Sequence, residues 1–573
     1  MAVASAAALL LLACGAGAEP IFPNGRPGCQ GPPEACPDLR RDDTVQLQIK
    51  HHSFESSRSR VNETLRGSVL SCLKKEMQAK YVIDPSKGGY DNAKKMVNDW
   101  SGTAGGVESQ LKPEPVVIAQ VQSKEDAARA VFCAKKFGIQ ACARSGQHGW
   151  DNEGGCDKGL LVDVQDLLKF NLNKDKKTVW FGAGNWLGRI YNKLYLDGNA
   201  KYYVPVGVVS CVGPGLILGC GRGLATSVKG LACDAIKAIR YIDADGNEQQ
   251  ANKNQNQDMF WMAKGGAGEF PGIITEFKMK ANRAPNDVWT TQCDYTNYGQ
   301  ATSAMKEWFN QNPAMLDPDR KAYTALSLFN GAKTSIKLYC LGCNQGEKNW
   351  VQDRMNAING ASGYGGSCSQ TTKSWLDQIL YESGAPNGAN WNWLLNRENG
   401  YGKNGNINTR GPQIANGRVS DSWNVPTSII NAITSGCWNG QGEPYSMFCG
   451  VYPITGEKVT KVGEQDTAYG GRDIKWTFHY KYGMAKGQSS GYYNSFKQAS
   501  VNFQNELDKW MPCRNFYNYI DTDGMVCNGG ESKRGSKKWL NAYFSNATKM
   551  QEIKLAVDPD DVIRSIGLPD AAD

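Results

Sequence analysis

The stretch VPVGVVSCVGPGLILGCGRG, residues 204–223, is the densest glycine region of the chain. Its glycines permit close backbone approaches, so backbone N–H groups can face a bulky anionic ligand as they do in phosphate-binding loops. A set of tight turns would have the same composition. The stretch holds no GxGxxG between a strand and a helix, and no Walker lysine and hydroxyl follow it. The flanking segments must therefore show whether the stretch binds a ligand or only forms turns.

Strand-like and helix-like segments alternate before this stretch. Ser123 is the predicted N-cap of a helix that ends at Gly138, and 185–194 predicts a second helix. Beyond the stretch, DADG at 243–246 predicts a hairpin turn, and 258–281 holds a second glycine turn that leads into a strand. Four apolar runs predict strands before it: 116–121, 139–143, 159–164 and 178–184. This order of elements indicates an α+β or α/β fold.

The composition changes in the C-terminal half. From about residue 285 to 505 the chain becomes rich in Trp, Tyr, Asn and Gly, which predicts a separate module. IKWTFHYKY at 474–482 predicts a strand in it. Residues 539–567 predict a helix that ends at the Asp-Pro-Asp break near Pro559.

The N-terminal residues and the cysteines indicate a secreted protein. MAVASAAALLLLACGAGAEP holds an apolar stretch too short to span a bilayer, followed by small residues before Glu19, as in a signal peptide. Of 18 cysteines, Cys14 leaves with that peptide, and the 17 that remain suit an oxidising compartment with several disulfides and one unpaired thiol. Cys340 and Cys343 form a lone CxxC, which favours a disulfide or separate partners over a metal site.

Charge and hydropathy exclude two classes of partner. The formal net charge of +8 is modest for 573 residues, and the basic cluster at 532–538 lies among glycine and serine, so nucleic-acid binding is not expected. No later apolar run reaches 18 residues, so no membrane span is expected. Asn62 and Asn546 begin glycosylation acceptor sequences.

Several motifs in succession carry a family resemblance. RSGQH at 144–148, PVGVVSCVGPGLILGCGRG at 205–223, SVKGLACDA at 227–235 and DMFWMAKGGAGEFPGIITEF at 258–277 are similar to four motifs of one family, in the family's order. NYID at 518–521 and YFSNATKMQEIKLAVDPDDV at 543–562 match its C-terminal motifs. The chain resembles the berberine-bridge-enzyme-like FAD oxidases, secreted proteins with the flavin fold of the vanillyl-alcohol oxidase superfamily. The likeness covers about residues 66–284 and 512–566.

The resemblance implies an α+β architecture with a two-subdomain, PCMH-type FAD-binding domain. A substrate domain built on an antiparallel sheet with helices is inserted into it, and the C-terminal segment returns to the FAD domain. The expected boundaries are a signal peptide at 1–18, an N-terminal extension at 19–65, the FAD-binding domain at 66–284, the substrate domain at 285–510 and the berberine-bridge-like segment at 511–573. A disulfide between Cys72 and Cys133 is also implied.

The resemblance further implies that His148 attaches covalently to the 8α-methyl of FAD, and that no metal is bound. A turn of small residues lets a neutral imidazole approach that methyl group. The family column of a second, cysteine link falls on Val209, and Cys211 lies two residues further, where a local shift of the loop could bring it to the ring; a single attachment is the default expectation. Gln147 stands where the family has glycine, and Leu216 lies near its usual histidine. The remaining expected FAD-binding residues are Arg144, Ser145, Gly146, Gln147, Gly213, Gly215, Gly219, Gly221, Asp234 and Ile273.

Catalysis requires a proton acceptor beside the flavin. The resemblance points to Tyr519, with Tyr517 as its neighbour, although a buried tyrosine can also serve packing alone. A phenol with a reference pKa of about 10 needs a nearby cation or hydrogen-bond donor to become a base. His479 is an alternative base in the strand at 474–482, where packing explains a histidine equally well.

The substrate prediction rests on composition. Flat indoles stack on sugar faces and amides match ring hydroxyls, so a carbohydrate suits the tryptophans among asparagines and glycines, although tryptophans are more often core residues. These tryptophans are Trp375, Trp391, Trp393, Trp423 and Trp438. The leading hypothesis is a monomeric oxidase that converts the anomeric carbon of a sugar to a lactone, with O2 reduced to H2O2. The alternatives are oxidation of an alkaloid or aromatic alcohol, and a flavin- or sugar-binding relative without catalysis.

Overall fold

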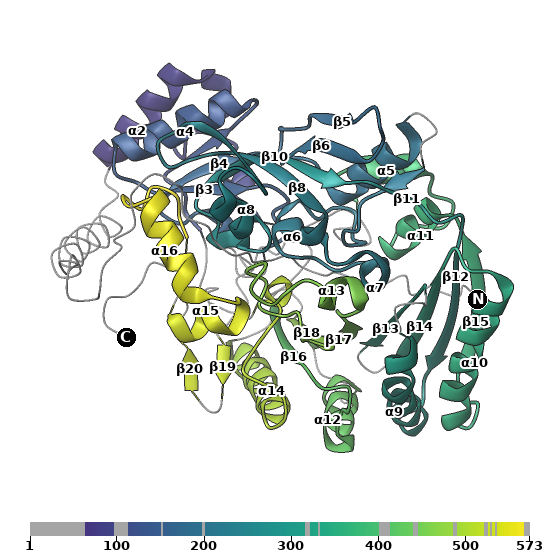
Figure 1. The fold of residues 1–573 in the computed structure, drawn as a ribbon. Coiled ribbons are helices and arrows are strands. Elements are labelled where there is room, and N and C mark those ends of the chain that lie inside the picture. The colour runs from purple at the N-terminus through teal and green to yellow at the C-terminus, as the bar shows by residue number, and fades with distance from the viewer. Residues whose placement is uncertain are drawn as a thin grey trace, which may run out of the picture.

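The computed structural model has an upper part of mixed sheets and a lower part built on one large sheet (Figure 1). It describes residues 63–96, 113–149, 153–197, 201–315, 321–329, 333–399, 413–438, 445–484, 490–520, 525–527, 530–532 and 536–565. The predicted signal peptide, most of the N-terminal extension and Asn62 lie outside these residues.

The first sheet of the upper part has the order β1-β2-β4-β3, in which β2, β4 and β3 run parallel and β1 is antiparallel. Its helix α4 begins at Ser123, whose side chain accepts a hydrogen bond from the Asp126 N–H, and Gly138 follows the helix with a φ of +63°. The elements are α2 (Glu63–Glu76), η2 (Ala79–Tyr81), β1 (Val82–Ile83), α3 (Tyr90–Ala93), β2 (Val117–Gln120), α4 (Lys124–Lys136), β3 (Ala141–Arg144), η3 (Glu153–Gly155) and β4 (Leu160–Asp163).

The second sheet of the upper part is antiparallel, with the order β5-β6-β10-β8-β9. The predicted DADG turn joins β8 to β9, and its Gly246 has a φ of +84°. The strands are β5 (Phe170–Leu172), β6 (Thr178–Gly182), β8 (Ile236–Ile242), β9 (Glu248–Asn252) and β10 (Ile273–Lys280), beside the small pair β7 (Tyr202–Tyr203) and β11 (Asn282–Arg283). The helices are α5 (Leu187–Leu196), α6 (Gly215–Leu218), α7 (Thr226–Lys229), η5 (Ala232–Ala235), α8 (Gln257–Ala263) and η6 (Ala267–Glu269).

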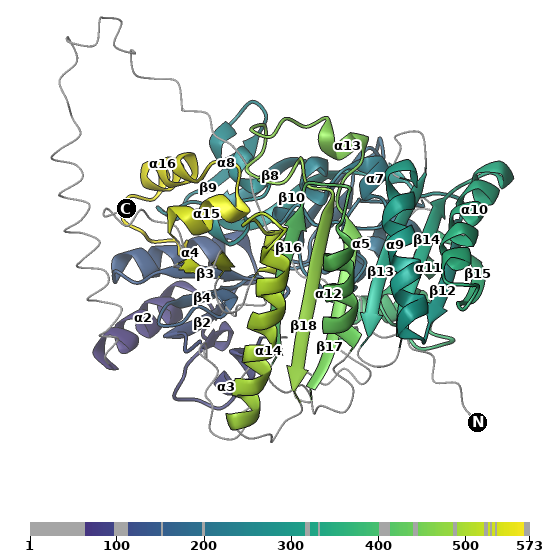
Figure 2. The same ribbon diagram turned by 90° about the horizontal axis from the view of Figure 1, so that it is seen from below.

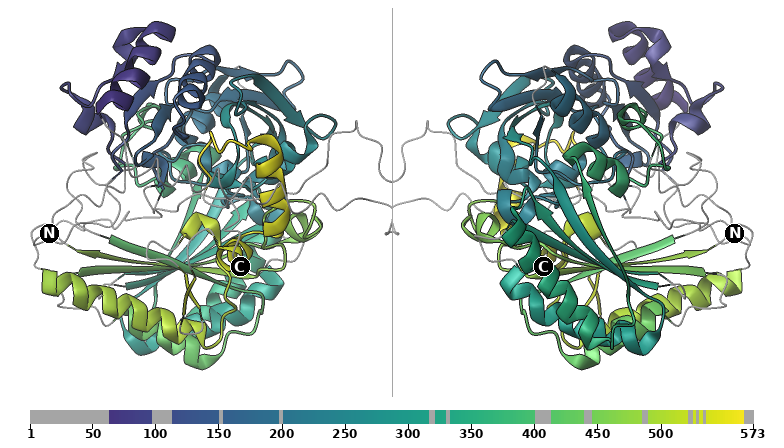
Figure 3. Two further views of the ribbon diagram at one scale, coloured as in Figure 1. Left: turned by 90° about the vertical axis from the view of Figure 1, so that its left-hand side faces the viewer. Right: turned by 90° about the vertical axis from the view of Figure 1, so that its right-hand side faces the viewer.

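The lower part is a seven-stranded antiparallel sheet, which confirms the predicted substrate-domain architecture. Its order is β15 (Ser367–Lys373), β12 (Val288–Tyr295), β14 (Lys333–Leu341), β13 (Ala322–Phe329), β17 (Tyr445–Pro453), β18 (Trp476–Met484) and β16 (Gln413–Ser420). Four long helices cover its outer face: α9 (Tyr298–Met315), α10 (Gln345–Ala361), α12 (Thr427–Trp438) and α14 (Ser490–Asp508) (Figures 2 and 3). Shorter elements complete it: α11 (Trp375–Glu382), η7 (Trp391–Leu395) and α13 (Glu457–Thr460).

The two faces of this sheet belong to two hydrophobic cores. Trp476 and Phe478 of β18 pack toward the outer helices. Because successive side chains of a strand point to opposite faces of the sheet, His479 points to the other face. Tyr323 of β13 and Tyr452 of β17 lie on that opposite face too, in the core shared with the upper part. The inner face of the sheet therefore presents aromatic side chains to the upper part.

The C-terminal segment returns to the upper part, as expected. Ile563 forms a parallel bridge with Ala141 at the edge of β3, and the Arg564 side chain donates to Gln140. The predicted helix ends before Pro559, as expected, but it is interrupted: α15 (Lys537–Tyr543) and α16 (Ala547–Val557) are separate, and Asn546 caps the second one. The segment also contains η9 (Tyr517–Tyr519), β19 (Met525–Cys527) and β20 (Gly530–Ser532).

The described residues contain six disulfides, and Cys72–Cys133 is one of them, as the resemblance implied. Cys340 pairs with Cys343, so the CxxC is a disulfide. The others are Cys142–Cys156, Cys220–Cys233, Cys293–Cys368 and Cys437–Cys449. Within the same residues, every helix is too short or too polar to cross a membrane.

Candidate active site

A cavity of about 250 Å³, here called the main cavity, lies where the RSGQH turn meets the glycine-rich stretch and the C-terminal segment. It is lined by residues 144–149, 213–215, 267–268 and 563–565, together with Phe270, Ile274, Tyr517 and Ile520 among others. Segments that are hundreds of residues apart thus form one site. Of the FAD-binding residues predicted from the sequence, seven line it: Arg144, Ser145, Gly146, Gln147, His148, Gly213 and Gly215.

Two glycines let the turn and the stretch touch through their backbones. A Cβ added to Gly146 would lie 2.2 Å from the Gly213 nitrogen, and one added to Gly213 would lie 2.6 Å from the Gly146 nitrogen. No other residue fits at either position without moving a backbone. This contact brings the two predicted binding segments to one wall of the cavity.

The rest of the turn is fixed by buried polar contacts. Arg144 pairs with Asp163 at 2.5 Å, and the Ser145 hydroxyl donates to the Ala183 carbonyl at 2.6 Å. Gln147 has a φ of +57°, the left-handed region that glycine adopts without strain. This conformation gives a physical reason for the glycine that the related motif carries at the same place.

His148 is buried and lies beside Cys211. The His148 Nε2 atom is 3.0 Å from the Cys211 Sγ atom, within hydrogen-bonding distance. Val209, in the column of the relatives' cysteine, lines a different, smaller cavity. The local path of the chain therefore brings Cys211, and not residue 209, to the histidine.

Four predicted FAD-binding residues do not line the main cavity. The Gly219 carbonyl accepts from the Asn518 side chain, and Gly221 packs against Leu216. Ile273 points away because Ile274, its neighbour on β10, occupies the cavity face. The fourth, Asp234, is held in the ion pair described next.

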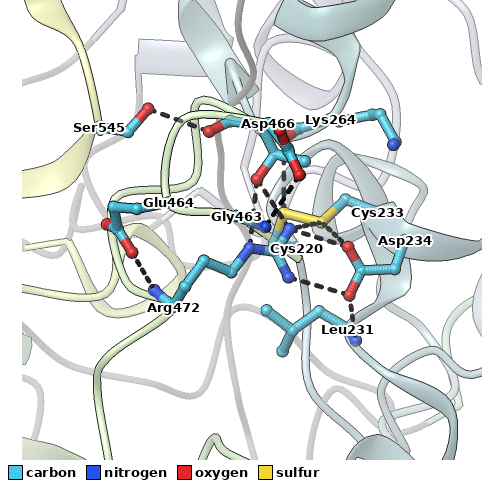
Figure 4. A network of polar contacts seen from close by, with 11 residues as sticks. Cys220, Leu231, Cys233, Asp234, Lys264, Gly463, Glu464, Asp466, Arg472 and Ser545 are labelled. Carbon is cyan, nitrogen blue, oxygen red and sulfur yellow. Dashed lines mark hydrogen bonds and ion pairs between the residues drawn. A yellow bond between two sulfur atoms is a disulfide. The ribbon is translucent and has the colours of Figure 1, made fainter. Parts of the chain in front are cut away.

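Asp234 joins the upper part to the loop that precedes β18 (Figure 4). Both of its carboxylate oxygens accept from Arg472, at 2.8 and 3.0 Å, and one also accepts from the Leu231 N–H. The Thr467 hydroxyl accepts a further hydrogen bond from Arg472, at 2.7 Å. The Cys220–Cys233 disulfide lies beside the ion pair. The structure gives Asp234 a role in joining these two segments, and its predicted contact with the cofactor stays a prediction.

The two predicted catalytic tyrosines lie in neighbouring cavities. Tyr517 lines the main cavity, and its hydroxyl lies 2.9 Å from where a Cβ on Gly268 would be. Tyr519 lines the smaller cavity with Val209, Leu216 and Arg222. One turn of 3-10 helix separates the two positions.

Arg222 is the centre of a buried group of aromatic side chains, here called the Arg222 cluster: Arg222, Tyr323, Tyr452, His479 and Tyr519. Its Nε donates to the Tyr519 hydroxyl at 3.1 Å and its Nη1 to the Tyr323 hydroxyl at 2.5 Å. The guanidinium lies 3.5 Å from the Tyr452 ring centre, and the His479 ring stacks on Tyr519 at 4.1 Å. The cluster joins the glycine-rich stretch to the inner face of the large sheet.

The cluster carries one positive charge at neutral pH. Burial raises the pKa of Tyr519 well above its ordinary value and that of Tyr323 as well, while Arg222 opposes both shifts. Burial, and then the charges of Lys481 and Arg222, hold the pKa of His479 well below its ordinary value. The phenols and the imidazole are therefore neutral, and the guanidinium is charged.

Sequence reasoning missed Arg222, Tyr323 and Tyr452. An arginine between Gly221 and Gly223 in an otherwise apolar stretch is the one local signal that could have drawn attention to it. The tyrosines stand among ordinary strand residues, so no spacing marks them.

The tryptophans predicted to stack on a sugar have packing roles where the structure describes their side chains. Trp375 is fully buried, Trp423 packs edge-on against Trp476, and Trp391 and Trp393 pack on the main core. The side chain of Trp438 lies outside the described residues. Four of these tryptophans thus have packing contacts, and their predicted role against a sugar stays a prediction.

Sequence comparison places known flavoproteins beside this chain. Residues 115–252 match the FAD binding domain family. An uncharacterized FAD-linked oxidoreductase of Bacillus subtilis, YgaK, is 32% identical over 252 residues, which are 42% of this chain and 55% of YgaK. Berberine bridge enzyme-like 23 of Arabidopsis thaliana is 24% identical over 482 residues, 79% of this chain and 83% of its own. The match to YgaK thus spans about half of that relative.

Solved structures share the whole architecture. Berberine-bridge-enzyme-like 1 of Physcomitrella patens has a TM-score of 0.73 at 21% identity, covering 87% of this chain and 99% of its own. The glucooligosaccharide oxidase of Acremonium strictum has a TM-score of 0.70 at 21% identity with the same coverage, and a chitooligosaccharide oxidase has 0.71 at 19%, covering 88% and 100%. The chain is therefore a homologue of the berberine-bridge-enzyme-like proteins, with an FAD-binding domain and their fold.

Proposed function

We propose that this protein is a secreted FAD-dependent oxidase that removes a hydride from the anomeric carbon of a sugar. The observation that carries the proposal is the main cavity, where the RSGQH turn, the glycine-rich stretch and Tyr517 meet. Two solved proteins of the same fold are named as oligosaccharide oxidases. The reaction converts the hydroxyl to a lactone carbonyl and reduces O2 to H2O2.

The residues of the main cavity suit the flavin. The backbone contact of Gly146 with Gly213 leaves a surface without side chains, against which a ring and its phosphates can lie. His148, in the same turn, is the proposed covalent attachment point, by a single link. Bound FAD supplies the acceptor for the hydride.

The chain itself supplies position and proton transfer. The substrate hydroxyl must lose its proton as the carbon loses its hydride, and we assign that proton to a tyrosine of the 517–519 segment. Tyr517 lines the main cavity and Tyr519 the smaller one next to it. Two substitutions test this assignment, since Tyr517→Phe and Tyr519→Phe each remove one hydroxyl and leave the ring.

Secretion is part of the proposal and is supported by the cysteines. The six disulfides of the described residues suit an oxidising compartment. Expression with the N-terminal 18 residues, followed by N-terminal sequencing of protein from the medium, tests it. Recovery of the protein only inside the cell would contradict secretion.

Oxidation of an aromatic or alkaloid alcohol is the second candidate. The main cavity favours it in one respect, because Phe270, Ile274 and Ile520 give it apolar walls. Aromatic rings bind to such walls more readily than hydroxylated sugars do.

The test is anaerobic mixing of the purified holoprotein with sugars and with aromatic alcohols, followed by flavin absorbance. Reduction by a mono- or oligosaccharide and release of the lactone are expected. Reduction by aromatic alcohols alone would move the assignment to the second candidate, and reduction by neither would indicate a binding protein without catalysis.

A further inference from the structure

We propose that the Arg222 cluster binds the carboxylate of an acidic substrate. This inference rests on the proposed function only in placing the substrate at the same site. It adds a substrate class, the sugar acids or the aromatic acids, in place of a neutral sugar or alcohol.

The first argument is charge. Arg222 is 7% exposed and stays protonated at any ordinary pH. Among the described residues, no carboxylate forms an ion pair or hydrogen bond with Arg222. Glu382, whose charge acts on Tyr323 and Tyr452, is bonded instead by Lys337, Tyr339 and Gln378. An isolated buried cation is costly, and an anionic ligand removes that cost.

The second argument is the supply of hydrogen-bond donors. The Nη2 atom of Arg222 is buried without a hydrogen-bond partner in the described structure. The Tyr519 and Tyr323 oxygens accept from Nε and Nη1, so the proton of each hydroxyl must point to another acceptor. A guanidinium edge beside phenolic O–H groups suits a carboxylate, which only accepts.

The third argument is location. Arg222 lines the smaller cavity with Tyr519, Val209 and Leu216. The space there is on the order of one water molecule, so it takes one carboxylate oxygen and not a sugar ring. The segment 516–520 contributes Tyr517 and Ile520 to the main cavity, and Phe516, Asn518 and Tyr519 to the smaller one. The body of the substrate then lies outside the smaller cavity.

The assignment also separates the two tyrosines. In this arrangement Tyr519 stays protonated and donates to the carboxylate, as its raised pKa supports. Tyr517, which lines the main cavity, is then the proton acceptor. Tyr519→Phe should weaken binding of the acid, whereas Tyr517→Phe should lower the rate of flavin reduction and leave binding intact.

The experiment measures binding to holoprotein whose flavin has been reduced with dithionite under anaerobic conditions, so that no turnover occurs. Calorimetry compares two pairs of probes that differ in one group, D-galacturonate with D-galactose and benzoate with benzyl alcohol. We expect one acid to bind at least about tenfold more tightly than its neutral partner, as for a charged hydrogen bond. A preference in the sugar pair indicates a sugar acid, and one in the aromatic pair an aromatic acid.

Two variants separate charge from structure. Arg222→Lys keeps the charge and should keep part of the preference, whereas Arg222→Gln keeps a donor without charge and should bring the acid and its neutral partner to near-equal affinity. Flavin absorbance and melting temperature show that each variant is folded and loaded. If Arg222→Gln does not fold, the wild-type pairs and Arg222→Lys decide.

Three results would overturn the inference. The first is that the wild type binds the acid and its neutral partner equally in both pairs. The second is that Arg222→Gln keeps the full preference for the acid. The third is a tyrosinate absorbance at neutral pH that Tyr519→Phe abolishes. None of them touches the proposed function, because a neutral sugar could still reduce the flavin. Conversely, if the acid preference depends on Arg222 but no probe reduces the flavin, the carboxylate site is supported and the proposed oxidase activity is contradicted.

Discussion

The main cavity and the Arg222 cluster lie side by side but are built in opposite ways. The wall of the cavity is a contact between two short segments, the turn 144–148 and the stretch 204–223, and its key atoms are in the backbone. The cluster takes one side chain from the glycine-rich stretch, three from separate strands of the large sheet and one from the C-terminal segment. A backbone contact demands particular residue types, whereas a side-chain cluster demands only that distant positions meet.

The largest expected effect breaks the backbone contact. Gly146→Val places branched carbons against the Gly213 backbone, where even a Cβ would be 2.2 Å from the nitrogen. The free energy of unfolding should fall by about 4 kcal/mol or more, with loss of bound flavin. Urea unfolding and flavin absorbance measure both.

Gly67→Ala is the matched control for that variant. Gly67 lies in α2 with nothing within 4 Å of an added Cβ, so alanine should stabilise the helix by about 0.5–1 kcal/mol. If Gly146→Val unfolds at the same urea concentration as the wild type, the close approach of the two segments is not a feature of the folded protein.

The second prediction concerns the proposed covalent link at the same wall. His148→Ala should leave all flavin in the supernatant after acid precipitation, because the attaching nitrogen is gone. Cys211→Ala removes the sulfur 3.0 Å away and should leave the flavin in the pellet. Dye in the supernatant from Cys211→Ala, or in the pellet from His148→Ala, would move the attachment to the cysteine.

Sequence reasoning succeeded where a local rule acts. The cap at Ser123 and the turn at Gly246 each follow from residue types whose capping or backbone preferences are strong. The break before α16 was missed because Asn546 looks like an ordinary polar residue inside a helical pattern. Its role as an N-cap depends on the non-helical backbone conformation at that position.

The contacts that sequence reasoning missed join residues that lie far apart in the chain. Asp234 was assigned to the cofactor because its neighbours matched a motif, but its partner Arg472 comes from a loop more than 200 residues away. Tyr323 and Tyr452 likewise become site residues only when the sheet turns its inner face to the glycine-rich stretch. No periodicity in one segment encodes such meetings.

The third prediction tests the pair that fastens these parts together. Arg472→Met leaves the mostly buried Asp234 carboxylate without its partner, and the free energy of unfolding should fall by about 3–5 kcal/mol. The double variant with Asp234→Asn should recover part of the loss, since the uncompensated charge is removed. Additive losses in urea unfolding would mean that the two side chains do not act as a pair.

The smallest expected effect refines the backbone side of the comparison. Gln147 has a φ of +57°, and a non-glycine residue in the left-handed region is strained by about 1 kcal/mol. Gln147→Gly should therefore raise the free energy of unfolding, although the greater entropy of glycine in the unfolded chain offsets part of the gain. Gln147→Ala keeps the Cβ and with it the strain, so it should show no such gain. Equal stability of the glycine and alanine variants in urea would mean that the backbone at 147 is not strained, and that the glycine of the related motif serves closeness to the ligand instead.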